Sequence, residues 1–220
     1  MGLKRVLIRC LPTSTNRLRR AALRFADEEV GEDEIGRFAR IPGCLNEEQG
    51  SVLCYLAAHP QGCGCVVEIG SFMGRSTLWL AHGVRFAGEG RVFSIDPHAG
   101  NERPALRPDL DSYDAFLLHI RQAGMTQFIE PLRERSQSVA PRWDQPIRLL
   151  WIDGSHEYED VLADLEGFAP HVITGGHIAL HDTSGRGFPG VPRAMREYFG
   201  RCPEFRRIAS LRNMTVYQRM

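Results

Sequence analysis

Short apolar runs alternate with helix-like segments along most of the chain. Five runs have the length of strands and end near polar residues: CVVEIG (65–70), RVFSID (91–96), FIEPLRE (128–134), RLLWID (148–153) and GHIALHD (176–182). Three segments between them have the apolar spacing of helices: STLWLAHGVRFA (76–87), SYDAFLLHIRQAG (112–124) and YEDVLADLEGFAPHV (158–172). This alternation predicts β-α-β units in a parallel sheet that helices cover on both faces.

Patterns toward the two ends of the chain extend this prediction. Asn46 can cap a helix over 47–59, and EFRRIASLR (204–212) with MTVYQR (214–219) predicts a closing hairpin around Arg212 and Asn213. We therefore expect an α/β fold, a Rossmann-like doubly wound and mostly parallel seven-stranded sheet with a C-terminal antiparallel strand. Residues 1–45 show weak helical periodicity and are interpreted as a helical cap or oligomerisation segment, ahead of a main domain over 46–220.

Charge and cysteine content argue against several kinds of partner. The 27 basic and 27 acidic residues cancel, so the net charge favours neither nucleic acid nor a membrane surface, and we expect neither as a partner. The six cysteines show no CxxC pair and no zinc-type spacing. Arg9 and Pro12 interrupt the first apolar stretch, which is too short for a signal peptide, so we expect a cytoplasmic protein.

Small and polar residues follow the first two predicted strands, at the edge where open parallel sheets bind ligands. Gly70 and Gly74 would let a ligand approach the backbone, and Ser76 stands at a helix start whose N–H groups favour an anionic group. The spacing is not GxGxxG, the fingerprint of nicotinamide-binding proteins. Asp96 ends the second strand, where an acid can accept hydrogen bonds from both ribose hydroxyls. These residues together predict a nucleoside-containing ligand.

Three motifs resemble a known family. VVEIGSFMGRST, VFSIDPHAG and LLWIDGSHEYEDVLADLEGFAPHVITGGHIALHD, between Cys65 and Phe199, are similar to class I S-adenosylmethionine-dependent methyltransferases, in particular to small O-methyltransferases of macrolide sugars and catechols. The resemblance implies that 46–220 is a methyltransferase domain with S-adenosylmethionine as cofactor. It also implies a set of cofactor-binding residues: Glu68, Gly70, Ser71 and Gly74 around the methionine part, Asp96 at the ribose, Ser136 near the adenine and Asp153 beside the sulfonium. Ser76, at the helix start, is expected to bind the cofactor as well.

The resemblance further implies a catalytic base and a metal site. Metal-dependent relatives hold a divalent ion, usually Mg²⁺, with an acid at the position of Asp153 and two residues after the next strand, here His181 and Asp182. An imidazole suits zinc, iron or nickel better than Mg²⁺, so either Mg²⁺ or another divalent metal is expected. His156 corresponds to a histidine proposed as general base in the sugar enzymes, and an imidazole with its ordinary pKa of about 6.5 suits that role. We expect His156 and Asp153 to be the catalytic residues.

Two polar loops are candidates for the acceptor pocket. His98 heads a long loop over 97–113, a length typical of lids, and is expected to contact the substrate. Residues 184–192 are expected to form a second flexible loop that shapes the pocket. The acceptor is expected to be a small molecule or sugar, and a homo-oligomer is an open alternative.

Two other functions stay open on the sequence alone. A nicotinamide-dependent oxidoreductase would share the βαβ unit and Asp96, but the GxGxxG fingerprint is absent and Lys4 is the one lysine of the chain. A non-catalytic nucleoside-binding subunit would use the cofactor cleft alone. In that case His181 would mark a lost metal site.

Overall fold

A single sheet forms the centre of the protein. In the computed structural model, which describes residues 15–99 and 112–220, the strands are β1 (Cys65–Ile69), β2 (Val92–Ile95), β3 (Ile129–Leu132), β4 (Ile147–Ile152), β5 (Val172–Leu180), β6 (Phe205–Leu211) and β7 (Met214–Arg219). Their order across the sheet is β3-β2-β1-β4-β5-β7-β6. The first five strands are parallel, and β7 runs antiparallel to both β5 and β6. The predicted seven-stranded, mostly parallel sheet is confirmed.

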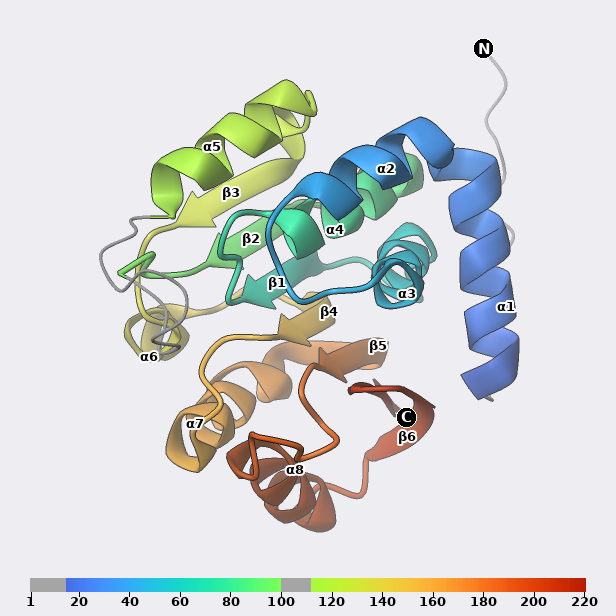
Figure 1. Ribbon diagram of the computed structural model, residues 1–220. Helices are drawn as coiled ribbons and strands as arrows, with labels where there is room; N and C mark the ends of the chain where they lie inside the picture. The colour runs from blue at the N-terminus through green and yellow to red at the C-terminus, as the bar shows by residue number, and fades with distance from the viewer. Residues whose placement is uncertain (1–14, 100–111) are drawn as a thin grey trace.

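Helices connect these strands and cover both faces of the sheet (Figure 1). Among the described residues they are α1 (Thr15–Phe25), α2 (Glu32–Arg40), α3 (Glu47–Ala58), α4 (Arg75–Ala87), α5 (Tyr113–Gln122), α6 (Ser136–Val139), α7 (Tyr158–Phe168) and α8 (Gly190–Arg201). Asn46 caps α3 as expected, because its side chain accepts from the Gln49 N–H at 3.0 Å while the Gln49 side chain accepts from the Asn46 N–H at 3.1 Å.

Two apolar cores, one on each face, hold the sheet between the helices. Side chains of a strand alternate between the faces, so Val66 packs with α3 and α4 whereas Val67 and Ile69 pack with α7 and α8. Every residue of β1 and of β4 is buried. Strands covered on both faces read as continuous apolar runs, which is why the sequence reveals them clearly.

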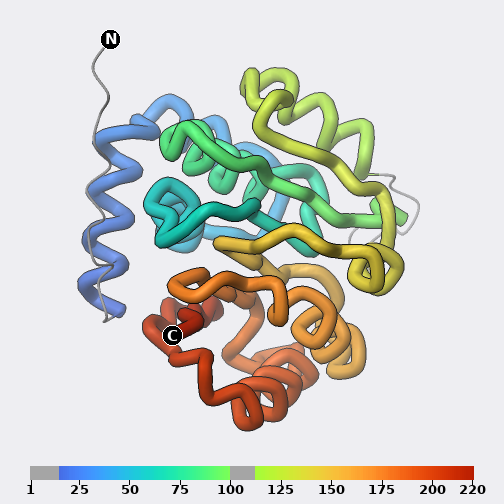
Figure 2. The backbone as a smooth tube through the Cα atoms, turned by 180° about the vertical axis from the view of Figure 1, so that it is seen from behind, coloured from blue at the N-terminus to red at the C-terminus, as the bar shows by residue number. Residues whose placement is uncertain are grey.

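The N-terminal helices belong to the first of these cores. Leu18, Ala22 and Phe38 are buried in the same cluster as α3 and α4, and the Thr15 hydroxyl accepts from the Ser210 N–H of β6 at 3.0 Å. Figure 2 shows α1 standing at the edge of the molecule near the C-terminal hairpin. Residues 1–14 lie outside the described part, and the predicted role of 1–45 in oligomerisation stays a prediction.

One predicted loop is shorter than expected. The segment expected to be a loop as far as Pro192 already becomes helical at Gly190, where α8 begins. Proline is tolerated in the first turn of a helix because the N–H that it lacks would have no partner there. Within the described residues, every helix is too short or too polar to cross a membrane.

Candidate active site

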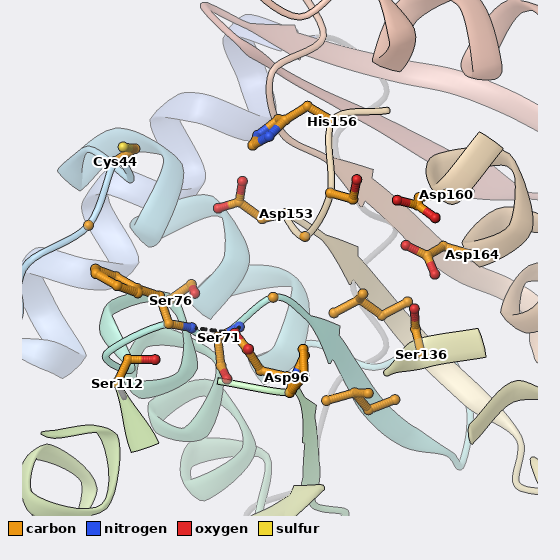
Figure 3. A pocket seen from close by; sticks show the side chains of 18 of the residues that line it. Cys44, Ser71, Ser76, Asp96, Ser112, Ser136, Asp153, His156, Asp160 and Asp164 are labelled. Atoms are coloured by element: carbon orange, nitrogen blue, oxygen red, sulfur yellow. Dashed lines mark hydrogen bonds between the residues drawn. The ribbon is translucent and has the colours of Figure 1, made fainter. Parts of the chain in front are cut away.

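A large cavity opens at the carboxyl ends of β1, β2 and β4. Its volume is about 670 Å³, a size typical of small-molecule and cofactor sites. Figure 3 shows Ser136, Asp160 and Asp164 on one side, Cys44 on the opposite side, and Asp96 and Asp153 between them. Most of the predicted site residues line it: Gly70, Ser71, Ser76, Asp96, Ser136, Asp153, His156 and Asp182. The strand-end positions identified in the sequence therefore do come together.

The loop after β1 forms one wall of the cavity with its backbone. Gly70 and Gly74 have φ angles of 86° and 92°, a left-handed conformation that favours glycine. A Cβ on Gly70 would lie 2.4 Å from the carbonyl oxygen of Asp153, so the loop after β1 and the end of β4 are in direct contact. This close approach leaves no room for a side chain at Gly70.

Glu68 lies beneath this loop and does not line the cavity. Its carboxylate is fully buried and accepts hydrogen bonds from the hydroxyls of Ser76 and Thr77, both at 2.5 Å, and of Ser94 at 2.7 Å. Burial raises the pKa of Glu68 to about 7, against the lowering effect of these hydrogen bonds. The predicted contact with the cofactor is therefore unsupported, because Glu68 instead fixes the start of α4 from below.

Asp96 joins the loop after β1 to the loop after β2. Its Oδ2 accepts from the backbone N–H groups of Ser71 at 2.9 Å and Phe72 at 2.8 Å, and its Oδ1 accepts from that of His98 at 2.7 Å. Phe72 and His98 both have positive φ angles, 47° and 53°. The carboxylate therefore fixes the two loops that border the cavity.

The side chain of His98 is buried beside the cavity and does not line it. It is 3% exposed, its Nδ1 lies 2.8 Å from the Ser112 hydroxyl, and its ring packs against those of Tyr113 and Phe116. The structure gives no support to the prediction that His98 contacts substrate. The rest of the predicted lid falls largely on residues 100–111, outside the described part of the chain.

Asp153, His181 and Asp182 form a cluster of possible metal ligands. One ligand atom of each lies within 4.8 Å of the other two. The buried His181 Nδ1 is 3.2 Å from Asp153 Oδ1 and 3.3 Å from Asp182 Oδ2, but neither oxygen is aligned for a hydrogen bond. Burial opposes a charge on His181, yet its contacts with the two carboxylates raise the pKa of the imidazole to about 10. The cluster thus has the composition expected from the sequence.

Asp182 also orients His156. Its Oδ2 lies 2.8 Å from His156 Nε2, and its Oδ1 accepts from the Asn213 side chain at 2.5 Å. Although burial works against it, the hydrogen bonds and charges of His156 and His181 hold the pKa of Asp182 well below its usual range. The ring of Phe188 stacks on His156 with centroids 3.9 Å apart. This carboxylate and this ring fix the direction of the imidazole.

The segment just before α3 closes the cavity opposite Ser136. Pro42 to Leu45 line it, and Arg75 at the start of α4 holds this segment in place. The guanidinium donates to the carbonyl oxygens of Ile41 at 2.5 Å and of Leu45 and Ala39 at 2.8 Å each. Part of the predicted N-terminal segment therefore belongs to the cavity wall.

Several residues at the site were missed by the sequence analysis: Arg75, Asp164, Phe188 and Asn213. Asp164 left a detectable signal, because it lies on the buried face of α7 with Val161, Leu165 and Phe168, where an acid is unusual. Phe188 lies in the loop over 184–192 that was expected to shape the pocket, although the residue itself was not singled out. Arg75 and Asn213 act through contacts between distant parts of the chain and left no signal.

Comparison with known proteins identifies the fold and the family. Residues 67–183, more than half of the chain, match the family described as methyltransferase domain. Cofactor-bound Rv0187 from MTB has a TM-score of 0.66 at 19% identity, over 90% of this chain and 95% of that one. The O-methyltransferase from Bacillus cereus in complex with SAH has a TM-score of 0.65 at 17% identity, over 91% and 97%. CalS11, TDP-rhamnose 3'-O-methyltransferase, has a TM-score of 0.58 at 17% identity, over 92% and 93%.

The glycine loop after β1, the acid after β2 and the sheet order fit this match. The comparisons offer no support for the nicotinamide-dependent alternative or for the non-catalytic one. The chain belongs to the methyltransferase-domain family and has the class I fold of S-adenosylmethionine-dependent methyltransferases.

Proposed function

We propose that this protein transfers the methyl group of S-adenosylmethionine to a hydroxyl oxygen of a small molecule or sugar. One observation carries the proposal: a single cavity is lined by both Asp96 with the glycine loop after β1 and the His156–Asp182 pair. The first group suits a nucleoside cofactor and the second suits removal of a proton. The fold shared with the Bacillus cereus O-methyltransferase and with CalS11, which acts on TDP-rhamnose, supports this choice of acceptor.

The chain's own groups suggest how the cofactor lies in the cavity. Asp96 would accept from a ribose hydroxyl through Oδ1, which accepts one hydrogen bond from the chain, whereas Oδ2 accepts two. The methionine part would lie along the backbone of Gly70 and Ser71, near the N-terminus of α4. This arrangement directs the sulfonium toward Asp153 and the adenine of the cofactor toward Ser136.

His156 has the geometry of a general base. Its Nε2 donates to Asp182 in the neutral tautomer, which leaves the Nδ1 lone pair to accept a proton from the acceptor hydroxyl. Among the described residues, the hydrogen bond from Nε2 to Asp182 is the one that the His156 ring makes. Phe188 limits rotation of the ring and shields one of its faces from water. A base positioned in this way contributes roughly 10²–10⁴-fold to the rate.

The residues around Asp153 fit a divalent metal. Within 15–99 and 112–220, the buried His181 Nδ1 has no aligned hydrogen-bond partner, and it faces two carboxylates at ion-pair distance. This donor set, one imidazole nitrogen and two carboxylates, suits zinc or iron at least as well as Mg²⁺. When bound by Asp153, His181 and Asp182, such an ion would supply Lewis-acid polarisation of the acceptor hydroxyl.

Binding and turnover test the proposal separately. S-Adenosylmethionine would be titrated calorimetrically into the wild type, into Asp96→Ala, and into Asp114→Ala, which removes an exposed acid of α5 as a matched control. We expect micromolar binding that Asp96→Ala abolishes and Asp114→Ala preserves. Repeating the titration with Mg²⁺, with Zn²⁺ and after EDTA would reveal any contribution of a metal. If the wild type binds no S-adenosylmethionine under any of these conditions, the proposal is wrong.

Turnover identifies the reaction. A panel of sugars, sugar nucleotides and catechols would be incubated with methyl-labelled S-adenosylmethionine, and the products examined for O-methyl groups. His156→Ala is expected to lower kcat about 10²–10⁴-fold while the affinity for S-adenosylhomocysteine stays unchanged. An unchanged kcat in that variant would remove His156 as the base.

A further inference from the structure

A second cavity lies at the opposite edge of the sheet from the candidate active site. It is found at the amino ends of β1, β2 and β4, where Gly64, Gly90 and Pro146 line it, and its volume is about 490 Å³. Two cysteines, Cys63 and Cys65, line the same cavity. Cavities of this size accommodate small molecules, and the residues that line this one take no part in the proposed methyl transfer.

The two cysteines are close enough to form a disulfide with each other. One residue, Gly64, separates them in the chain, so their Cα atoms are no more than about 7 Å apart, and disulfides join Cα atoms about 4.4–6.8 Å apart. Alternate residues of an extended segment direct their side chains to the same side, which agrees with both cysteines lining one cavity. A Cβ on Gly64 would lie 2.9 Å from the Pro146 carbonyl oxygen, so the position between the cysteines has room only for glycine.

The two thiols differ in how easily a reagent reaches them. Cys63 is exposed, whereas Cys65 is 6% exposed and its Sγ donates to the Pro146 carbonyl oxygen at 3.4 Å. Burial raises the pKa of the Cys65 thiol to about 12, and the positive charge of Arg148 acts in the opposite direction. Because thiolates rather than thiols attack disulfides, an external reagent would react first with Cys63.

A buried guanidinium lies directly behind this cysteine pair. Arg148 is 2% exposed, and its Nη2 donates to the carbonyl oxygens of Ala57 at 3.2 Å and Glu89 at 3.1 Å. Its Nε and Nη1 have no hydrogen-bond partner in the described part of the chain, which is uncommon for buried donors. A Cβ on Gly90 would lie 3.1 Å from Nη1, so the guanidinium stands just behind the cavity wall. A positive charge at this place favours the thiolate forms of both cysteines.

We propose that Cys63 and Cys65 form a reversible thiol-oxidation site that reacts with a low-molecular-weight disulfide in this cavity. The Cys63 thiolate attacks one sulfur of the reagent, whose S–S bond breaks and releases a first thiolate. The Cys65 thiol then gives up its proton and attacks the Cys63 sulfur, which closes a disulfide between the cysteines and releases the second thiolate. The two cysteine protons end on the two released thiolates, so two protein thiols are oxidised and one reagent disulfide is reduced. This reaction does not depend on the proposed methyl transfer.

Oxidised glutathione is the probe that tests this site. The reduced wild type, Cys63→Ser, Cys65→Ser and Cys44→Ser would each be incubated with it, treated with an alkylating reagent and examined by peptide mass spectrometry. Cys44 provides a matched control, because it is also exposed but lies outside the second cavity.

In the wild type and in Cys44→Ser, we expect the segment that carries Cys63 and Cys65 to lose the mass of two hydrogen atoms, and dithiothreitol should reverse this loss. In Cys65→Ser, a glutathione adduct should instead accumulate on Cys63, at least about tenfold above its wild-type level, because the thiol that displaces glutathione is gone. In Cys63→Ser, Cys65 should stay reduced because it is buried.

Three results in the wild type would overturn the proposal. These are a glutathione adduct that persists on Cys63, a disulfide from Cys63 to any cysteine other than Cys65, and no reaction at Cys63. None of the three depends on whether a variant folds.

Discussion

Replacing Glu68 with Gln should change how the stability of the protein depends on pH. The carboxylate is fully buried under the loop after β1, and its three partners are the neutral hydroxyls of Ser76, Thr77 and Ser94. Gln has nearly the same shape and can keep hydrogen bonds to hydroxyls that rotate. The exchange therefore removes the ionisation of the side chain with little change in packing.

The magnitude follows from the pKa of Glu68. The pKa is 4.5 for the ordinary group and about 7 in the folded protein. Each unit of difference between these two pKa values changes the free energy of unfolding by about 1.4 kcal/mol. A raised pKa adds stability that is fully present below about pH 4.5 and is lost as the pH rises through about 7. Keeping the carboxylate charged thus costs the fold about 3 kcal/mol at pH 8, and most of this loss occurs between pH 5 and pH 8.

Urea unfolding of the two proteins measures this cost. The buried indole of Trp151 provides a fluorescence signal, and unfolding at pH 5 and pH 8 gives a free energy for each protein. Relative to the wild type, Glu68→Gln should gain about 2–3 kcal/mol of stability between pH 5 and pH 8. Asp164, whose pKa is also raised, is present in both proteins, so its contribution cancels.

Any constant cost of the Gln side chain, such as a weaker hydrogen bond, shifts both measurements equally and leaves the difference between them unaltered. Glu166→Gln serves as the control for loss of one negative charge at the surface. If Glu68→Gln differs from the wild type by the same free energy at both pH values, Glu68 is not the buried, hard-to-ionise group described above.

Three further substitutions test the walls of the site. Arg75→Ala should lower the free energy of unfolding by about 1–2 kcal/mol and weaken S-adenosylhomocysteine binding several-fold, because three charge-assisted bonds to the segment before α3 are lost; wild-type affinity would show that this segment does not form the cofactor wall. Asn213→Ala should reduce kcat about tenfold to a hundredfold, since Asp182 loses the donor that orients it, and an unchanged kcat would exclude that role. Gly70→Ala should lower the free energy of unfolding in urea by at least about 2 kcal/mol, because Gly70 has a φ of 86° and a Cβ there would collide with the Asp153 carbonyl. Wild-type stability of this variant would show that the loop relaxes easily.

The sequence predicted the sheet well because β1 and β4 are buried on both faces and therefore appear as unbroken apolar runs. It also predicted which strand ends meet, since parallel strands bring their carboxyl ends to one edge. Glu68 shows where this reasoning fails. It precedes the loop by only two positions, but the alternation of side chains along β1 directs it into the α4 face.

The hydrogen bonds from Arg75 to the segment before α3 could not be predicted from the sequence, for a different reason. Its partners lie 30 to 36 residues earlier in the chain, and all three are backbone carbonyls, which carry no side-chain signal. The start of α8 was placed too late because proline was taken as the end of a loop, whereas it stands in the first turn of the helix.

The three N–H groups held by Asp96 have a consequence for how a ligand binds. Because the chain's own carboxylate holds the backbone of Ser71, Phe72 and His98, we expect much of the conformational entropy of these loops to be lost on folding and not on binding. The positive φ angles of Phe72 and His98 are strained conformations that Asp96 helps to maintain. Removing this carboxylate would thus release two strained loops as well as the proposed ribose contact, and we expect the affinity lost in Asp96→Ala to combine preorganisation with direct recognition.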